Sequence, residues 1–322
     1  MIQGYIASEG RLRRAEEPLT EPGVAWLDLA NPMPHHRAEV EQALGIELPS
    51  REQMEEIEES SRLYVLDGTI YMTVPMPVQT ELDLPLLVPV SFILTERQLV
   101  TIHDYEPRAF KTFPQRAEKI AMGCFDGESV LMGLLDAIVD RLADVLEAVG
   151  RQIEQLTRNV LHARHGPSEP PKDYGDVLRD IGHQGEIVSN VLRSLVSIER
   201  LLVFIGPAMA GRLVLKETRT RIKSLTRDTH FLSEHCNFLA QKISFLLDAT
   251  LGMIGIEQNA TIKIFSVAAV VFLPPTLIAS IYGMNFADMP ELDWRFGYPM
   301  GLAMMVASAL GSYWVFKRKG WL

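Results

Sequence analysis

Two long apolar runs stand out near the C-terminal end of the sequence, one over residues 262–281 and the other from about 298 to 316. Each run has about 20 residues, which at a rise of about 1.5 Å per residue matches the roughly 30 Å hydrocarbon core of a bilayer. The pattern therefore predicts two transmembrane helices, over 262–282 and 298–316. Two buried helices of a large soluble core are the alternative, although such long apolar helices rarely follow one another directly.

The segment between the two runs is short and polar, and the tail after the second run is basic. Residues 283–297 carry Asp288, Glu291 and Asp293 against the single cation Arg295, whereas residues 317–322 read Lys-Arg-Lys-Gly-Trp-Leu. The positive-inside rule places the basic tail in the cytoplasm and the loop outside. Residues 1–5 do not begin a signal peptide. We therefore expect a multi-pass protein of the plasma (inner) membrane with both termini in the cytoplasm.

Residues 1–125 alternate short apolar segments with polar turns. Asp67-Gly68 is a strong hairpin signal between strands at 62–65 and 69–74. Further strands are predicted over 25–29, 87–94 and 98–103. Helices are expected over 37–44 and from Ser50, where Gln53 completes a capping box. The segment predicts a cytoplasmic α/β domain with a largely antiparallel sheet.

From residue 129 the pattern becomes helical. Apolar residues recur at steps of three and four up to about residue 164, and a Gly/Pro-rich break follows at 166–171. A second helix is predicted from 174 to 205, ending at Gly206-Pro207. We expect residues 126–210 to form an antiparallel helical hairpin.

A third helix is predicted from about residue 211, and residues 211–261 would form a stalk that leads into the first span. Apolar residues recur in it at seven-residue steps, with a second series at the matching offset. This seam either packs on the preceding hairpin or brings copies of the stalk together. The two series of the seam are Leu225, Leu232, Leu239, Leu246 and Met253, and Ile222, Thr229, Cys236, Ile243 and Thr250.

The fold class is therefore an α+β domain with a helical hairpin and a stalk helix, followed by two transmembrane helices.

One face of the first span carries small or polar side chains at steps of three and four residues. Pro274-Pro275 lies within this span and should bend or widen the helix. Two spans cannot enclose a pore, so conduction would require several copies, each contributing this face. Serine and threonine in membrane helices also bond back to their own helix, which is the alternative role. The residues of this face are Asn259, Ile262, Ser266, Ala269, Leu273, Thr276 and Ser280.

The net charge of −10 argues against a nucleic-acid partner and suits a surface that attracts cations. Cys124 and Cys236 are far apart in sequence and are expected to be free thiols. No nucleophile–base pair and no phosphate-binding loop stands out, so we expect neither an enzyme nor an organic cofactor.

Four C-terminal features together resemble the CorA family of divalent-cation channels. They are the motif Tyr282-Gly283-Met284-Asn285, the two terminal spans, the Met-Pro-Glu-Leu sequence at 289–292 and the basic Trp-Leu tail. The resemblance is tightest over 246–322 and is architectural upstream. It implies a homopentamer that carries Mg²⁺, and also Co²⁺ and Ni²⁺, into the cell down the membrane potential.

The resemblance also implies residue roles. Gly283, Met284 and Asn285 would form the selectivity motif, with a ring of Asn285 amides at the outer mouth and Asn259 at an inner ring. Leu273 would be an apolar constriction and Thr276 a polar position below the mouth. Ile262 and Phe265 would lie at inner constrictions. Mg²⁺ holds its waters tightly, and neutral oxygens can recognise the hydrated ion through these waters without binding it too firmly to leave. The acids Asp288, Glu291 and Asp293 either raise the local cation concentration or are simply solvated.

The sequence departs from the CorA family in one place and has histidines that allow another function. Near Ser224, where the family's magnesium-sensing carboxylate would fall, residues 222–226 carry no acid, and the nearest one is Asp228. No partner among the glutamates at 55, 56, 58 and 59 can be matched, so the regulatory metal site is unknown. His230, His235 and Cys236, with His162 and His165, leave open a zinc transporter of the same architecture, with or without proton coupling. A membrane-tethered scaffold or sensor is the further alternative.

Overall fold

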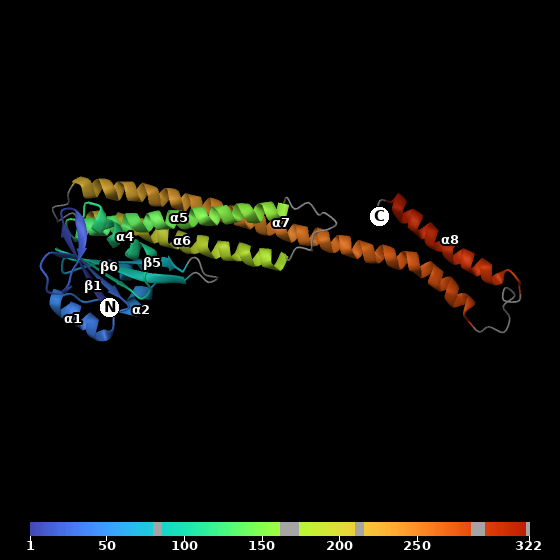
Figure 1. The fold of residues 1–322 in the computed structure, drawn as a ribbon, viewed down its shortest axis with the longest axis horizontal. Coiled ribbons are helices and arrows are strands. Elements are labelled where there is room, and N and C mark those ends of the chain that lie inside the picture. Colours follow the sequence, from blue (N-terminus) through green and yellow to red (C-terminus); the bar gives the residue numbers. More distant parts are fainter. Residues whose placement is uncertain (80–85, 162–173, 210–215, 285–293, 320–322) are drawn as a thin grey trace. The chain divides into compact units, whose positions relative to one another are not determined.

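The computed structural model describes residues 1–79, 86–161, 174–209, 216–284 and 294–319 (Figure 1). The chain divides into two compact units, Met1–Leu247 and Asp248–Leu322. The first unit holds a sheet with surrounding helices, and the second holds two apolar helical segments. This arrangement confirms the predicted fold class.

A seven-stranded mixed sheet forms the centre of the first unit, in the order β2-β1-β3-β7-β6-β5-β4. The pair β3/β7 is parallel, and the other neighbouring pairs are antiparallel, as predicted. The strands are β1 (Ile2–Ser8), β2 (Arg11–Arg14), β3 (Val24–Ala30), β4 (Leu63–Leu66), β5 (Thr69–Val78), β6 (Leu86–Leu94) and β7 (Leu99–His103).

Strands β1 and β2 were not predicted from the sequence. Their hairpin turns at Glu9 and Gly10, which both have positive φ, as the favoured two-residue hairpin turn requires. In β2 only Leu12 is buried, among three arginines, so the strand lacks the apolar alternation that a sequence pattern would reveal.

Six helices of the first unit are α1 (Pro34–Leu44), α2 (Arg51–Glu55), α3 (Glu59–Arg62), α4 (Arg108–Lys119), α5 (Gly127–Leu161) and α6 (Tyr174–Ala208). The capping box at α2 is present, because Ser50 Oγ accepts from the Gln53 amide at 3.2 Å and Gln53 Oε1 accepts from the Ser50 amide at 2.7 Å. Helix α6 continues through Gly206 and Pro207, where the sequence predicted its end. Helix α4 was not predicted.

The sheet is covered on both faces. Its larger core contains Trp26, Phe92 and Phe110 together with residues of α4, α5 and α6, and it extends to side chains of α7 (Lys216–Tyr282). A smaller core on the other face joins Leu29 and Ile102 to residues of α1 and α2. The alternating side-chain directions of a strand explain why Trp26 and Leu27 belong to different cores.

A buried polar network ties β3 to β7, the parallel pair. Trp26 Nε1 donates to Thr101 Oγ1 at 2.8 Å, and Thr101 Oγ1 donates to Asp28 Oδ1 at 2.6 Å. His103 Nε2 lies 3.0 Å from the same carboxylate oxygen. Asp28 is only 3 % exposed, so its side-chain oxygens need these hydrogen-bond partners in place of water. Burial, and secondarily the Asp28 charge, raise the pKa of nearby Tyr5 to about 12.

We expect Thr101→Val to destabilise the first unit. The substitution leaves the Trp26 N–H without its acceptor and removes one of the two partners of the Asp28 carboxylate, so that only His103 remains, at a cost on the order of 2 kcal/mol. Thermal melting of the full chain, followed by circular dichroism, should show an earlier transition. Thr112→Val is the matched control, because the Thr112 hydroxyl is exposed and bonds only to its own helix. Identical melting of T101V and the unmodified chain would contradict the assigned role.

Candidate pore-lining site

Helix α7 contains residues 216–261 of the predicted stalk together with the predicted first span, in 67 residues. Residues 211–215, with which the stalk was predicted to begin, lie outside the described residues. Its part from Asp248 belongs to the second unit, together with α8 (Gly297–Arg318). Both helices are long and apolar enough to cross a membrane. The backbone stays helical through Pro274 and Pro275 and ends at Tyr282.

The predicted pore-lining side chains are all exposed on the surface of this unit. Their large members, Ile262, Phe265 and Leu273, are 62–71 % exposed, which is unusual for apolar residues unless lipid or another chain covers them. The small and polar members lie between them. The full set is Asn259, Ile262, Phe265, Ser266, Ala269, Leu273, Thr276 and Ser280.

A different face of α7 is shielded. Val267 is buried, and Val271, Pro274, Ile278 and Tyr282 are partly covered, again at steps of three and four. At about 100° per residue, the centre of this stripe lies about 150° around the helix from the centre of the candidate pore line. Helix α8 has a matching stripe of its own at Gly297, Gly301, Met305, Ser308 and Ser312. The candidate pore line is therefore on the uncovered side of α7.

The hydroxyl of Thr276 donates to the carbonyl oxygen of Phe272 at 2.7 Å. The alternative role considered for this residue, bonding back to its own helix, is thus present in the structure. Since the proton is used within the helix, Thr276 offers a ligand only oxygen lone pairs. Such an acceptor suits the protons of water bound to a cation.

The motif after α7 is described only in part. The Gly283 amide donates to the Ala279 carbonyl at 2.9 Å, and both Gly283 and Met284 are exposed. A Cβ at position 283 would lie 3.0 Å from the Ala279 oxygen, so the close turn favours glycine there. Asn285 and the acids Asp288, Glu291 and Asp293 lie outside the described residues, and their roles remain predictions.

The stalk part of α7 packs on the helical hairpin through the seam of seven-residue spacing. Leu225, Cys236 and Leu239 are buried in the larger core, and Thr229 is fully buried between them. Arg221 also pairs with Asp136 of α5 at 2.9 Å. Of the two interpretations left open by the sequence, packing on the hairpin is therefore the one that this seam adopts.

A second series on the stalk was missed. Phe231, Phe238 and Phe245 follow one another at seven-residue steps and are 67 %, 58 % and 60 % exposed. The sequence did contain the signal, since three aromatic residues at this spacing form one helical stripe. The prediction used only the aliphatic seam, which the rest of the chain covers.

Within the described parts of the chain, no group of three or more His, Cys, Asp or Glu side chains is placed to hold a metal ion. His230 pairs with Glu199 at 3.5 Å and with Glu234 at 3.8 Å, and Asp228 accepts from Ser224 at 3.3 Å. Cys236 is buried in the core. His162 and His165 lie outside the described residues.

The fold combines an α/β unit with a second unit whose two helices are long and apolar enough to cross a membrane. Comparison with known proteins specifies the class. The family model for CorA-like Mg²⁺ transporter protein matches residues 21–318. The chain is similar to magnesium transport protein CorA of Pasteurella multocida (35 % identity) and of Escherichia coli K12 (34 %), over all of this chain and all of each relative.

Among solved structures, the complete structure of the CorA magnesium transporter from Methanocaldococcus jannaschii has a TM-score of 0.78. It shares 19 % identity with this chain and covers 100 % of it, and the match includes 99 % of the archaeal chain, so that likeness concerns the fold. The chain belongs to the CorA family of Mg²⁺ transporter proteins, which confirms the resemblance seen in the sequence.

We expect Cys236 to resist thiol-reactive reagents in the folded protein. Burial raises its pKa to about 12, so almost no reactive thiolate is present at pH 8, and the sulfur is inaccessible. Maleimide labelling read by mass spectrometry should modify it only after denaturation. A cysteine introduced at exposed Ser224 of the same helix serves as the accessible control. Labelling of both sites at equal rates would contradict the packing of α7 on the hairpin.

Proposed function

We propose that this chain is the subunit of a channel that carries Mg²⁺ into the cytoplasm across the inner membrane. The likeness to magnesium transport proteins over the full length supports the ion. The observation that carries the mechanism is the line of small and polar residues on the uncovered side of α7. A helix face of this kind needs either lipid or further copies of itself, and its polar groups favour copies around water.

The channel would be a homopentamer, as the family resemblance implies. One α7 cannot surround an ion, so several copies must contribute the same face. The exposed phenylalanines supply a contact for this assembly, since apolar side chains at seven-residue spacing are typical of helices that pack around a common axis. The same spacing continues along the sequence of α7 through Gly252, Asn259, Ser266, Leu273 and Ser280.

Selection of the ion is assigned to neutral oxygens. In this proposal Asn285 of each subunit meets the hydrated ion at the outer mouth, Gly283 and Met284 shape the backbone beside it, and Asn259 forms an inner ring. Mg²⁺ sheds water reluctantly, so amide oxygens that accept from its waters can recognise it without trapping it. Asp288, Glu291 and Asp293 would concentrate cations outside.

The membrane potential is sufficient as the driving force. At 100 mV, negative inside, a divalent ion gains about 4.6 kcal/mol on entry. Transport would therefore need no nucleotide. The same pore would admit Co²⁺ and Ni²⁺. In this topology the N-terminal unit and the basic tail lie in the cytoplasm, as the charge asymmetry around the spans indicates.

The alternatives gain little from the described residues. A zinc transporter would be favoured by histidines gathered around a metal site, but His230 is paired with glutamates and Cys236 is buried away from solvent. A scaffold without transport leaves the polar line of α7 without a role. A vesicle flux assay separates all three functions, with Mg²⁺, Co²⁺, Ni²⁺ and Zn²⁺ compared with and without a proton gradient.

Asn285→Ala should abolish Mg²⁺ uptake while leaving the oligomer assembled, because it removes the proposed amide ring but keeps the stalk phenylalanines that are proposed to hold the copies together. Uptake is measured with a Mg²⁺-sensitive dye inside liposomes under an imposed potential. Asn237→Ala is the control, since it removes an exposed amide from the stalk of the same helix. Normal uptake by N285A would rule out the assigned selectivity position.

The purified protein should run in detergent as five copies of the 36.2 kDa chain, measured by light scattering. Phe238→Ser should reduce the pentamer fraction, because burying a phenylalanine is worth about 1.5–3 kcal/mol. Val203→Ser removes a similarly exposed apolar side chain from α6 and should have no effect. A stable monomer that still conducts Mg²⁺ would refute the shared pore.

A further inference from the structure

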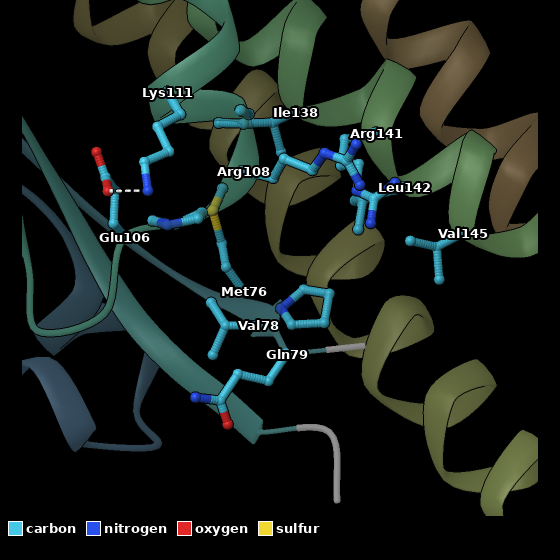
Figure 2. A pocket seen from close by; sticks show the side chains of 13 residues that line it. Met76, Val78, Gln79, Glu106, Arg108, Lys111, Ile138, Arg141, Leu142 and Val145 are labelled. Atoms are coloured by element: carbon cyan, nitrogen blue, oxygen red, sulfur yellow. Dashed lines mark ion pairs between the residues drawn. The ribbon is translucent and has the colours of Figure 1, made fainter. Parts of the chain in front are cut away.

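Helix α8 has an exposed apolar surface that leads to a group of cations at its C-terminal end. The cavity between β5, α4 and α5 in the first unit is different, because its apolar walls have almost no surface for a ligand to cover (Figure 2). Met76, Ile138 and Leu142 line that cavity and are only 2–3 % exposed. The surface on α8 is open, and the proposed ion pathway along α7 makes no use of it.

An apolar line runs along α8 at steps of four residues. Val306, Leu310 and Trp314 are 58 %, 62 % and 54 % exposed, and Lys317 continues the same face after a further step of three. At about 100° per residue, this line lies on the opposite side of α8 from the covered stripe that begins at Gly297. Since α7 is the other helix of this unit, the apolar line faces away from it, and in a bilayer the line would contact lipid.

Three consecutive cations follow the apolar line. Lys317, Arg318 and Lys319 are all exposed at the end of α8. No Asp or Glu occurs between residues 294 and 319, so this segment contains no acid that could neutralise them. The chain as a whole has a net charge of −10, which makes this end of α8 a local exception. Its positive charge is complementary to an anion and unsuited to the transported ion.

A cation–π contact connects the cations to the apolar line. The central carbon of the Arg318 guanidinium lies 3.8 Å from the centre of the Trp314 ring, one helical turn earlier. This stacking uses the flat face of the guanidinium, whereas its N–H donors lie in the plane of the group and can still bind a phosphate. Tryptophan is also typical of the boundary between hydrocarbon and headgroups. Trp314 therefore orients Arg318 where an apolar surface and an anion-binding surface meet.

We propose that this surface of α8 binds one anionic phospholipid of the bilayer per subunit. The phosphate would be bound by the cations at 317–319, and one acyl chain would lie along the apolar line. The rise from Val306 to Lys317 is about 17 Å, close to half of the roughly 30 Å hydrocarbon core and so to the thickness of one leaflet. The proposal rests on α8 crossing the bilayer, as in the proposed function, but it requires neither ion transport nor five copies.

The test is native mass spectrometry of the full chain in detergent, titrated with dioleoyl phosphatidylglycerol or with zwitterionic dioleoyl phosphatidylcholine. The anionic lipid should bind saturably, with one tight site per subunit and about tenfold more tightly than the zwitterionic lipid. Lys317→Gln should weaken binding of phosphatidylglycerol about fivefold and leave binding of phosphatidylcholine unchanged. Arg295→Gln is the matched control, because it removes one exposed cation just before the other end of α8.

Three results would overturn the proposal. They are equal binding of the two lipids, equal phosphatidylglycerol binding by K317Q and R295Q, or displacement of the lipid by an equal concentration of glycerol 3-phosphate, which has the phosphate but no acyl chain. The same spectra count the copies in each assembly, so a failure of the proposed pentamer is seen separately from a failure of lipid binding. Circular dichroism establishes that each variant is folded. If K317Q does not fold, Arg318→Gln replaces it, and unchanged phosphatidylglycerol binding by R318Q would equally refute the site.

Discussion

The packing of α7 on α5 and α6 is the interaction on which the first unit depends. Leu225, Cys236 and Leu239 extend the core that begins at the sheet, so the strands, the hairpin and the stalk share one apolar interior. The half-buried pair Arg221–Asp136 lies beside this contact. Burial raises the pKa of Asp136, and the charge and hydrogen bond of the Arg221 guanidinium act in the opposite direction. Arg221 therefore stabilises the ionised carboxylate of Asp136 at this half-buried position. Because the seam packs within the chain, the exposed phenylalanines lie on a different face of the stalk, which is the surface that the proposed assembly would use.

In the second unit, too, helix α7 has one covered face and one exposed face. A helix that covers one stripe with neighbouring side chains leaves the opposite stripe to lipid or to other copies, and here the polar residues fall on the open stripe. Fixed charges there would be costly in a bilayer, whereas a serine or threonine hydroxyl can bond to a carbonyl group of its own helix. The Thr276 hydroxyl does so while keeping its lone pairs available. In the proposed channel, neutral side chains would combine the stability of a membrane helix with contact to a hydrated ion.

Much of this architecture could be predicted because its pattern is local. The strands β5 to β7, the hairpin helices and both spans follow from alternation, from steps of three and four residues and from run length. Helix α4 was not predicted, and it has Pro107 at its N-cap position and Pro114 within it, whereas proline is unfavourable inside most helices. The network of Asp28, Thr101 and His103 could not be foreseen, since polar residues in a strand ordinarily indicate an exposed face. The partner of the stalk seam was equally undecidable, because a seven-residue repeat fits a neighbouring helix or another copy equally well.

The candidate site of one chain cannot surround a hydrated ion, so recognition of the ion would require several copies of the chain. One α7 presents a single amide or hydroxyl at each level and only from one side, whereas a hydrated Mg²⁺ carries waters in all six directions of an octahedron. Recognition of the whole shell requires acceptors around the ion, and a helix cannot provide these alone. Selectivity and oligomerisation would therefore depend on each other in the proposed channel. The neutral residues after Tyr282 would form a ring there, and the exposed phenylalanines of the stalk would supply the contact that brings the copies together.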